Sequence, residues 1–263
     1  MSASPRMPAL FIGHGSPMNA LEDNATTQMW ESFGNRFARP KTILVISAHW
    51  TTRGTAVTAM PAPKTIHDFG GFPQALFDMR YPAPGDPTLA ARVAQLLSPL
   101  TPSPVVLDQT WGLDHGTWSV LVKMYPDASI PVVQLSIDLS QPAAWHFALG
   151  QQLAVLRDEG VMIIGSGNVV HNLGRLDPRS EGYDWALRFN AAMRQAIENT
   201  QFEQVIHYQD LGQDAALSVP STEHFLPLLY VLGARTGEEP VEIVCDTMEL
   251  GSISMMSVVI GTE

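Results

Sequence analysis

Uninterrupted apolar runs alternate along this chain with stretches of helical periodicity. Continuous apolar runs occur at residues 9–12, 42–47, 132–137 and 161–165, a pattern typical of strands buried on both faces of a sheet. Shorter strands are expected at residues 55–60, 105–107, 241–244 and 252–260. Helices are predicted at residues 26–37, 87–97, 116–125, 142–157, 184–199 and 223–232. Strands and helices in alternation favour an α/β fold with a layered central sheet flanked by helices.

The boundaries of these elements carry their own signals. Asn24 is a predicted cap for the helix at residues 26–37, and Pro87 stands at the favoured first position of the following helix. Residues 61–84 are rich in proline, glycine and aromatic residues, which indicates a long functional loop. No internal repeat and no linker of changed composition divides the chain, so residues 1–263 are predicted to form a single domain.

Charge and cysteine content narrow the class of protein. The formal net charge is -11 and only 15 Lys and Arg are spread along the chain, which argues against a nucleic-acid partner. No apolar stretch approaches the roughly 18 residues of a membrane span, so we expect no membrane partner and a cytoplasmic location. Cys245 is the only cysteine, and a single cysteine excludes thiolate metal sites. It is predicted to be a buried small hydrophobe. The composition is compatible with a monomer or a small homo-oligomer.

Four of the eight histidines stand at the ends of predicted elements. His14, His49 and His171 follow apolar strands, and His224 opens a predicted helix. In open α/β sheets, ligands collect beyond the carboxyl ends of the strands. Imidazoles from distant parts of the chain can converge there on one ion, so the pattern predicts a metalloenzyme.

The neighbours of two of these histidines refine the prediction. Ser47 precedes His49 by two residues and is a candidate hydrogen-bond partner that orients its ring. Glu223 and His224 are adjacent on the predicted helix and would face different ways, so only one of them is expected to bind the metal.

Other polar motifs are interpreted as structural or are set aside. His146 and His207 lack a local motif and are interpreted as ordinary core or surface residues. The glycine-rich segment at residues 165–168 could bind a phosphate, but it lacks the third glycine of the dinucleotide fingerprint and the Lys-Ser/Thr of a P-loop. Ser16 is not part of a Gly-x-Ser-x-Gly motif, so a serine hydrolase is not favoured.

Six short motifs occur together in an order that resembles a known family. They are Gly13-His14-Gly15-Ser16-Pro17, Ser47-Ala48-His49-Trp50, His67-Asp68-Phe69-Gly70-Gly71-Phe72-Pro73, Asp114-His115-Gly116, Ser166-Gly167-Asn168-Val169-Val170-His171-Asn172 and Glu223-His224-Phe225-Leu226-Pro227-Leu228. The match extends from about Met7 to the C-terminal end. In type and order the motifs resemble the DOPA 4,5-dioxygenase-like branch of the class III extradiol ring-cleavage dioxygenases.

The resemblance implies one α/β domain that opens a catechol such as DOPA next to its diol, using O₂ and one non-haem divalent metal ion. By position, His14, His49 and His224 are the implied metal ligands, with Glu223 the less favoured candidate in the third ligand region. His171 matches the family's catalytic acid/base histidine and is an implied fourth ligand when no substrate is bound. His115 is similar to a second active-site histidine that positions the substrate.

The identity of the metal separates two readings of this site. Fe²⁺ is expected for ring cleavage, whereas Zn²⁺ also suits a site of three or four histidines and is expected in isolated protein. The alternative function is therefore a zinc-dependent hydrolase that uses the same histidines, although the chain has no His-Glu-x-x-His motif. A third reading is a non-enzymatic protein that binds metal or catechol. Arg6, Arg53 and Arg80 are candidate partners for a substrate carboxylate.

Overall fold

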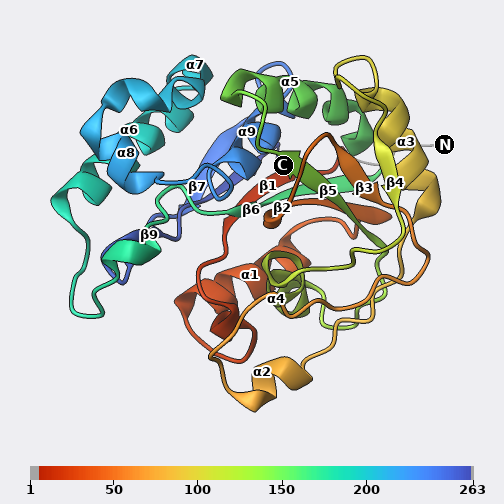
Figure 1. Ribbon diagram of the computed structural model, residues 1–263, viewed down its shortest axis with the longest axis horizontal. Helices are drawn as coiled ribbons and strands as arrows, with labels where there is room; N and C mark the ends of the chain where they lie inside the picture. Colours follow the sequence, from red (N-terminus) through yellow and green to blue (C-terminus); the bar gives the residue numbers. More distant parts are fainter. Residues whose placement is uncertain (1–5, 262–263) are drawn as a thin grey trace.

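A mixed eight-stranded sheet lies at the centre of the computed structural model, which describes residues 6–261 (Figure 1). Its strands are β1 (Ala9–Gly13), β2 (Thr42–Thr52), β3 (Ala56–Thr58), β4 (Val106–Asp108), β5 (Val132–Asp138), β6 (Val161–Gly167), β7 (Val241–Cys245) and β10 (Ser257–Ile260). Their spatial order is β4-β3-β5-β2-β6-β1-β10-β7. The four central strands, β5, β2, β6 and β1, run parallel, while β3 and β10 pair with them in the antiparallel sense.

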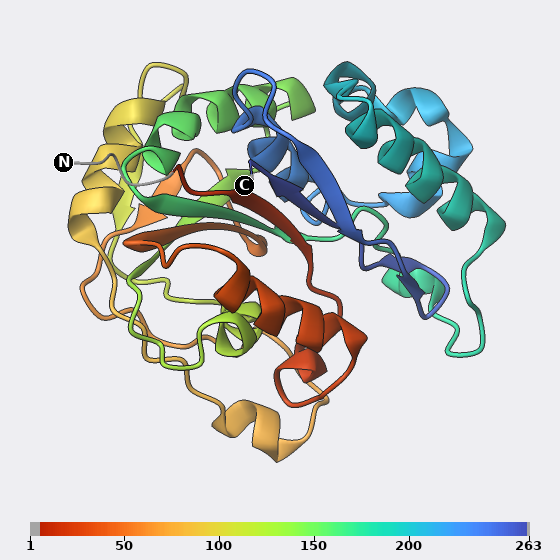
Figure 2. The same cartoon turned by 180° about the vertical axis from the view of Figure 1, so that it is seen from behind.

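Helices cover both faces of this sheet, as the two opposite views show (Figures 1 and 2). The helices are α1 (Ala25–Arg36), α2 (Gln74–Asp78), α3 (Pro87–Leu97), α4 (His115–Met124), α5 (Ala143–Leu153), α6 (Asp184–Glu198), α7 (Phe202–Ile206), α8 (Gln213–Ser218) and α9 (Leu226–Gly233). One face packs against α1 and α4, and the other against α3, α5 and α9, with α6 alongside. The predicted layered α/β architecture is confirmed. Within residues 6–261, no helix is both long and apolar enough to cross a membrane.

The central strands are apolar throughout because both of their faces are buried. In β1, Leu10 and Ile12 belong to the core cluster that contains Trp30 of α1 and Trp118 of α4. Phe11 points the other way, into the cluster of α3, α5 and α9. This alternation follows from the two-residue period of a strand, and it explains why the sequence pattern is a continuous run.

Side-chain caps fix where the main helices begin. Asn24 accepts a hydrogen bond from the backbone N–H of Thr27, and the Thr27 hydroxyl accepts one from the N–H of Asn24, so the predicted cap is confirmed. The carboxylate of Asp86 caps α3, which has the expected Pro87 in its first turn. Asp114 caps α4 in the same way and thereby sets the position of His115, the first residue of that helix.

Several boundaries differ from the predicted ones. The predicted strand at residues 252–260 consists of two strands, β9 (Ile253–Ser254) and β10. Strand β9 forms a hairpin with β8 (Met248–Glu249), in which Ser254 pairs with Met248, whereas Ser257 of β10 pairs with β7. The last predicted helix begins at Leu226 instead of residue 223, since the preceding residues form a turn. The predicted loop at residues 61–84 contains the short helix α2. Cys245 is only half-buried, because β7 is the edge strand of the sheet.

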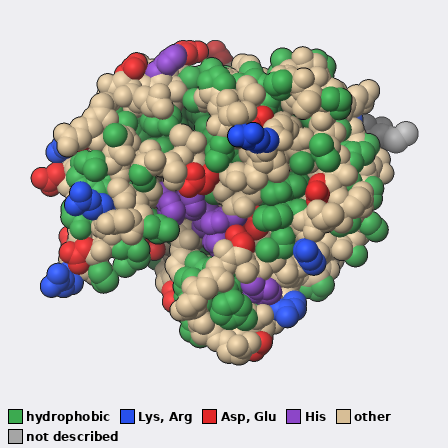
Figure 3. Space-filling view, viewed as in Figure 1, with side chains coloured by type: hydrophobic (Ala, Val, Ile, Leu, Met, Phe, Trp, Pro, Cys, Tyr) green, Lys and Arg blue, Asp and Glu red, His purple; other side chains and the backbone are tan. Residues whose placement is uncertain are grey.

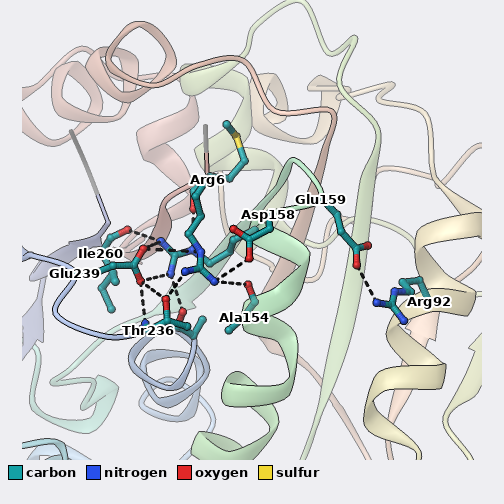
Figure 4. A network of polar contacts seen from close by, with 11 residues as sticks. Arg6, Arg92, Ala154, Asp158, Glu159, Thr236, Glu239 and Ile260 are labelled. Atoms are coloured by element: carbon teal, nitrogen blue, oxygen red, sulfur yellow. Dashed lines mark hydrogen bonds and ion pairs between the residues drawn. The ribbon is translucent and has the colours of Figure 1, made fainter. Parts of the chain in front are cut away.

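A buried guanidinium joins the beginning of β1 to the end of β10, within the polar network around Glu239 and Ile260 that Figure 4 shows. Arg157 has no solvent exposure and donates hydrogen bonds to the backbone carbonyls of Met7, Ala234 and Ile260. Both of its terminal nitrogens also bond the carboxylate of Glu239, at 2.8 Å each. A buried charge is tolerated only when it is fully paired, so this network ties four chain segments together.

We predict that close packing of α5 on α9 requires a glycine at position 150. A Cβ at Gly150 would lie 2.3 Å from the carbonyl oxygen of Tyr230, which is backbone and cannot move aside easily. The free energy of unfolding of the G150A variant, measured by urea denaturation, should therefore be about 1–3 kcal/mol lower than that of the wild type. This holds although alanine is the better helix former.

Gly70→Ala is the matched control, because nothing lies within 4 Å of a Cβ at that position. Its stability should stay within about 0.5 kcal/mol of the wild type. A G150A midpoint equal to that of the wild type would contradict the proposed contact.

Candidate metal centre

Three histidines converge at the carboxyl ends of neighbouring parallel strands. His14 follows β1, His49 lies near the end of β2, and His224 precedes α9. One ring nitrogen of each lies within 4.8 Å of the others. The N–H of Asn168, just after β6, bonds the carbonyl of His224 at 2.9 Å and so brings this residue to the strand ends. Figure 3 shows histidine side chains gathered in a hollow at the middle of this face.

An irregularity in β2 turns His49 toward the cluster. The pairing of β2 with β5 shifts its register between Ile46 and Thr51, and His49 lies within this interval. Such irregularities commonly re-aim a side chain beside an active site. Gly116 permits the close approach, since a Cβ there would lie 2.9 Å from the His49 ring and 2.5 Å from the Ser47 hydroxyl.

The hydrogen bonds of His14 determine which of its nitrogens faces the cluster. Its Nδ1 lies 3.0 Å from the hydroxyl of Ser166, and that hydroxyl donates its single proton to the carbonyl of Gly116 at 2.6 Å. The hydroxyl must therefore accept the other bond, so Nδ1 of His14 carries the proton. The lone pair of Nε2 is consequently free and points into the cluster.

The other two rings are held in the same tautomer by different partners. Nδ1 of His49 lies 3.3 Å from Oδ2 of Asp68, a carboxylate that can only accept. Nδ1 of His224 lies 3.1 Å from Oδ1 of Asn168, whose amide orientation is set because its NH₂ group donates to the carbonyl of Ser254. In all three histidines Nε2 therefore carries no proton, and its lone pair is available to bind a metal ion.

The donor set fits one divalent metal ion. Nε2 of His14 and Nε2 of His49 are 3.1 Å apart, and two lone pairs at this distance cannot hydrogen-bond each other. Metal–nitrogen bonds of about 2.0–2.1 Å would let both atoms bind the same ion. Burial holds the pKa of His14 and of His224 well below the usual value, and burial and the neighbouring His115 lower the pKa of His49 to about 3. The three rings are therefore neutral at pH 7, ready to bind a cation.

His171 lies beside the three candidate ligands. Its ring stacks on that of His224 with 3.4 Å between the ring centroids and 5° between the planes. Burial lowers the pKa of His171 to about 4, although the nearby Glu223 opposes this shift. His171 does not belong to either group of potential ligand atoms found among residues 6–261. His171 therefore lies next to the candidate metal ligands without belonging to their group.

Asp68 links two histidines and is the residue that sequence reasoning missed. Its Oδ1 accepts the backbone N–H of His115, and its Oδ2 lies 3.0 Å from Nδ1 of His115 and 3.3 Å from Nδ1 of His49. Although burial acts in the opposite direction, the hydrogen bond and charge of His115 lower the pKa of this carboxyl group. The residues around Asp68 form no local motif that would indicate a role in orienting a histidine. Only the fold brings this loop over the ends of the strands.

Ser47 does not orient the ring of His49 as predicted. Its hydroxyl donates to Asp114 at 2.7 Å and accepts the backbone N–H of His49 at 3.3 Å. Asp114 is fully buried and also accepts from the backbone of Thr117 and the amide of Gln134. Ser47 therefore fixes the backbones on either side of the cluster, whereas Asp68 orients the imidazole.

A cavity of about 450 Å³ opens over the histidines. Its walls are formed by the five histidines of the site, Asp68, Glu249 and mainly apolar residues: His14, Gly15, Ser16, Pro17, His49, Asp68, Phe69, Phe72, His115, His171, Leu173, Leu176, His224, Glu249, Leu250 and Ile253. The size is typical of a small-molecule site. Phe69 and Phe72 come from the predicted functional loop at residues 61–84 and supply flat apolar surface.

The remaining candidate residues lie elsewhere. His146 is a buried core residue bonded to the hydroxyl of Tyr230, and His207 is exposed at the end of α7, as interpreted from the sequence. Glu223 accepts a hydrogen bond from Ser221 and is not part of the cavity wall. None of Arg6, Arg53 and Arg80 belongs to the wall either.

The class of enzyme with this fold and this site follows from a match to a protein family. Residues 8–261 match the family model described as the catalytic LigB subunit of aromatic ring-opening dioxygenase. The chain therefore belongs to the LigB family of aromatic ring-opening dioxygenases, and it is an enzyme.

Individual relatives place it more narrowly within that family. It is 56% identical to "4,5-DOPA dioxygenase extradiol" of Escherichia coli K12, over 98% of this chain and 96% of the relative. It is 40% identical to the protein of the same name from Beta vulgaris, over 93% and 92% of the two chains. The chain also resembles the crystal structure of an uncharacterized E. coli K12 protein, with a TM-score of 0.84 and 51% identity. The match covers 97% of this chain and 100% of the E. coli chain. The predicted resemblance to the DOPA 4,5-dioxygenase-like branch is confirmed.

We predict that Asp68 controls metal affinity through His49. Asp68→Asn removes the charge that holds Nδ1–H of His49 in place, so zinc affinity measured by chelator competition should fall about 10–100-fold. Asp78→Asn is the matched control, because Asp78 lies in the same loop but is exposed and accepts a hydrogen bond from Gln74. Equal zinc affinities of D68N and D78N would contradict the role of Asp68.

Proposed function

We propose that the protein is a metal-dependent extradiol dioxygenase that uses O₂ to open the ring of a catechol such as DOPA by 4,5-cleavage. The observation that carries the proposal is the convergence of three neutral imidazoles, each presenting Nε2, at the floor of a cavity with aromatic walls. The names of the relatives support DOPA as the model substrate.

His14, His49 and His224 are the residues that would hold the ion. When bound there, Fe²⁺ supplies sites for the catechol oxygens and O₂ and the means of electron transfer between them. Three histidine nitrogens also suit Zn²⁺, which is redox-inert. We therefore infer that iron supports ring opening, and that zinc-loaded protein binds catechols without converting them.

His171 is the proposed proton carrier of the site. Because its pKa is lowered to about 4, the ring is neutral in the free enzyme at every pH well above that value and can accept a catechol proton. The protonated ring can return the proton once the substrate has reacted. Its stacked contact with His224 keeps it beside the ligand group throughout.

His115 and the phenylalanines of the loop are assigned to the substrate. The backbone N–H of His115 donates to Asp68, and Nδ1 lies 3.0 Å from the same carboxylate, so Nε2 is the ring atom assigned to a substrate oxygen. Phe69 lies edge-on to His115, with 5.5 Å between the ring centroids, and Phe72 lies edge-on to Phe69. Packing of an aromatic substrate against these rings would exclude water from the reacting bond.

The cytoplasmic location and the monomeric or small oligomeric state stay predictions.

The proposed reaction is tested by oxygen consumption. Protein that is freed of metal and loaded anaerobically with Fe²⁺ should consume O₂ when DOPA or another catechol is added, with loss of the catechol absorbance. The zinc-loaded protein is the control and should consume none. Ester or amide hydrolysis by the zinc form, without O₂ uptake by the iron form, would instead favour the zinc hydrolase.

We predict that His171→Ala separates metal binding from turnover. The variant should keep its metal, since three other histidines hold it, while kcat falls about 10²- to 10⁴-fold because the proton carrier is lost. Metal content and the rate of O₂ uptake are measured on the same sample. His207→Ala, an exposed histidine outside the site, serves as the control and should match the wild type. Near-normal turnover by H171A would refute the assignment.

A further inference from the structure

One carboxylate in the cavity wall has no part in holding the histidines. Glu249 is the last residue of β8, and it pairs with Ile253 of β9. Ile253 in turn forms a β-bridge with His171 on its other side. The three residues thus lie side by side across one small antiparallel ladder, and all three line the cavity. With a strand spacing of about 4.8 Å, the backbones of Glu249 and His171 are roughly 10 Å apart.

The hairpin that carries Glu249 is held firmly in place. The carbonyls of Leu250 and Gly251 at its turn accept the backbone N–H groups of Asp177 and Tyr183, at 2.9 and 3.0 Å. On the other side, the N–H of Ser254 donates to the carbonyl of Val170 at 2.9 Å. The backbone of Glu249 therefore has a defined position relative to the histidines of the site.

The side chain of Glu249 has no partner within the part of the chain that the structure describes. No hydrogen bond or ion pair reaches its carboxylate; burial and the charge of Glu22 are the influences on its pKa, and both raise it. A half-buried carboxylate near a second one is stabilised by a cation. The cavity wall contains no lysine or arginine that could supply that cation.

A substrate can supply the cation that the wall lacks. The rest of the cavity mouth beside Glu249 is apolar, with Leu173, Leu176 and Leu250 in the wall. Leu173, Leu176 and Leu250 are 63%, 42% and 39% exposed, so they form an apolar patch at the cavity of the kind that marks a ligand-binding surface. A catechol ring placed at the histidines would direct a short substituent along these leucines toward Glu249.

We propose that Glu249 is the specificity residue of this enzyme and accepts the ammonium group of an aminated catechol. The substrate class is then a catechol with a short ring substituent that ends in a cationic amine. This inference rests on the proposed function for the catechol-binding site, and it assigns the recognition of the substituent to one residue. The absence of lysine and arginine from the described wall means that a carboxylate substituent alone finds no partner there.

The experiment compares two catechols that differ only in the ammonium group. Dopamine and the ethylcatechol of the same substitution pattern are titrated anaerobically into zinc-loaded protein, so that binding is measured without turnover. The wild type should bind dopamine about tenfold or more tightly than ethylcatechol, as a charge-assisted hydrogen bond provides. Glu249→Gln should lose most of this preference and leave the affinity for ethylcatechol nearly unchanged.

Two further variants sharpen the test. Glu238→Gln removes the same charge from an exposed position outside the cavity, and it should keep the wild-type preference. Glu249→Arg should reverse the preference toward dihydroxyphenylpropanoate, whose carboxylate then has a partner.

The two proposals fail in different ways. Equal binding of dopamine and ethylcatechol by the wild type, or an unchanged preference in E249Q, would overturn the role of Glu249 whatever the oxygen electrode records. A dopamine preference that depends on Glu249, in protein that consumes no O₂ with any catechol after loading with Fe²⁺, would support Glu249 and refute the proposed reaction.

Discussion

The site depends on one constraint: three imidazoles, two buried and one half-buried, must all be neutral and must all turn the same nitrogen inward. Burial removes the protons by lowering the pKa values of His14, His49 and His224. Tautomer and orientation are then decided by the groups at Nδ1. The carboxylate of Asp68 has no proton to donate, and the hydroxyl of Ser166 and the amide of Asn168 spend their protons on other bonds, so all three groups accept. Without these partners the rings could hydrogen-bond one another, and the lone pairs would not be available to an ion.

The parallel centre of the sheet makes this arrangement possible. Because β1, β6 and β2 are adjacent and run in the same direction, their carboxyl ends bring residues that are far apart in the sequence to one edge. Residues 61–84 and the β8–β9 hairpin then close two sides of the cavity, and they contribute the groups that a substrate would contact. Two of the three candidate ligands, His14 and His49, therefore come from the strand ends and His224 from the turn before α9, whereas the proposed substrate contacts come from the segments that connect the strands.

Much of the fold could be predicted because burial on both faces leaves a direct trace in the sequence. The runs at residues 42–47 and 161–165 could hardly be anything but central strands, and Asn24 and Pro87 marked helix starts through local hydrogen bonding and fixed backbone geometry. Predictions failed where the tertiary structure decides the local conformation. The chain between Ile253 and Ile260 changes its pairing partner, and residues 221–225 form a turn that delays α9, although neither change alters the apolar pattern.

The sequence by itself determined the α/β class, the histidines that the resemblance selected and the family to which the chain belongs. Those features are encoded in residue type, period and order, which survive without coordinates. Only the tertiary structure decided that Asp68, and not Ser47, orients His49, that His171 stacks on His224, and that Glu249 lines the cavity without a partner among residues 6–261. Such contacts join residues that are tens to hundreds of positions apart, so no local pattern records them. They arise when strand ends and loops meet in space.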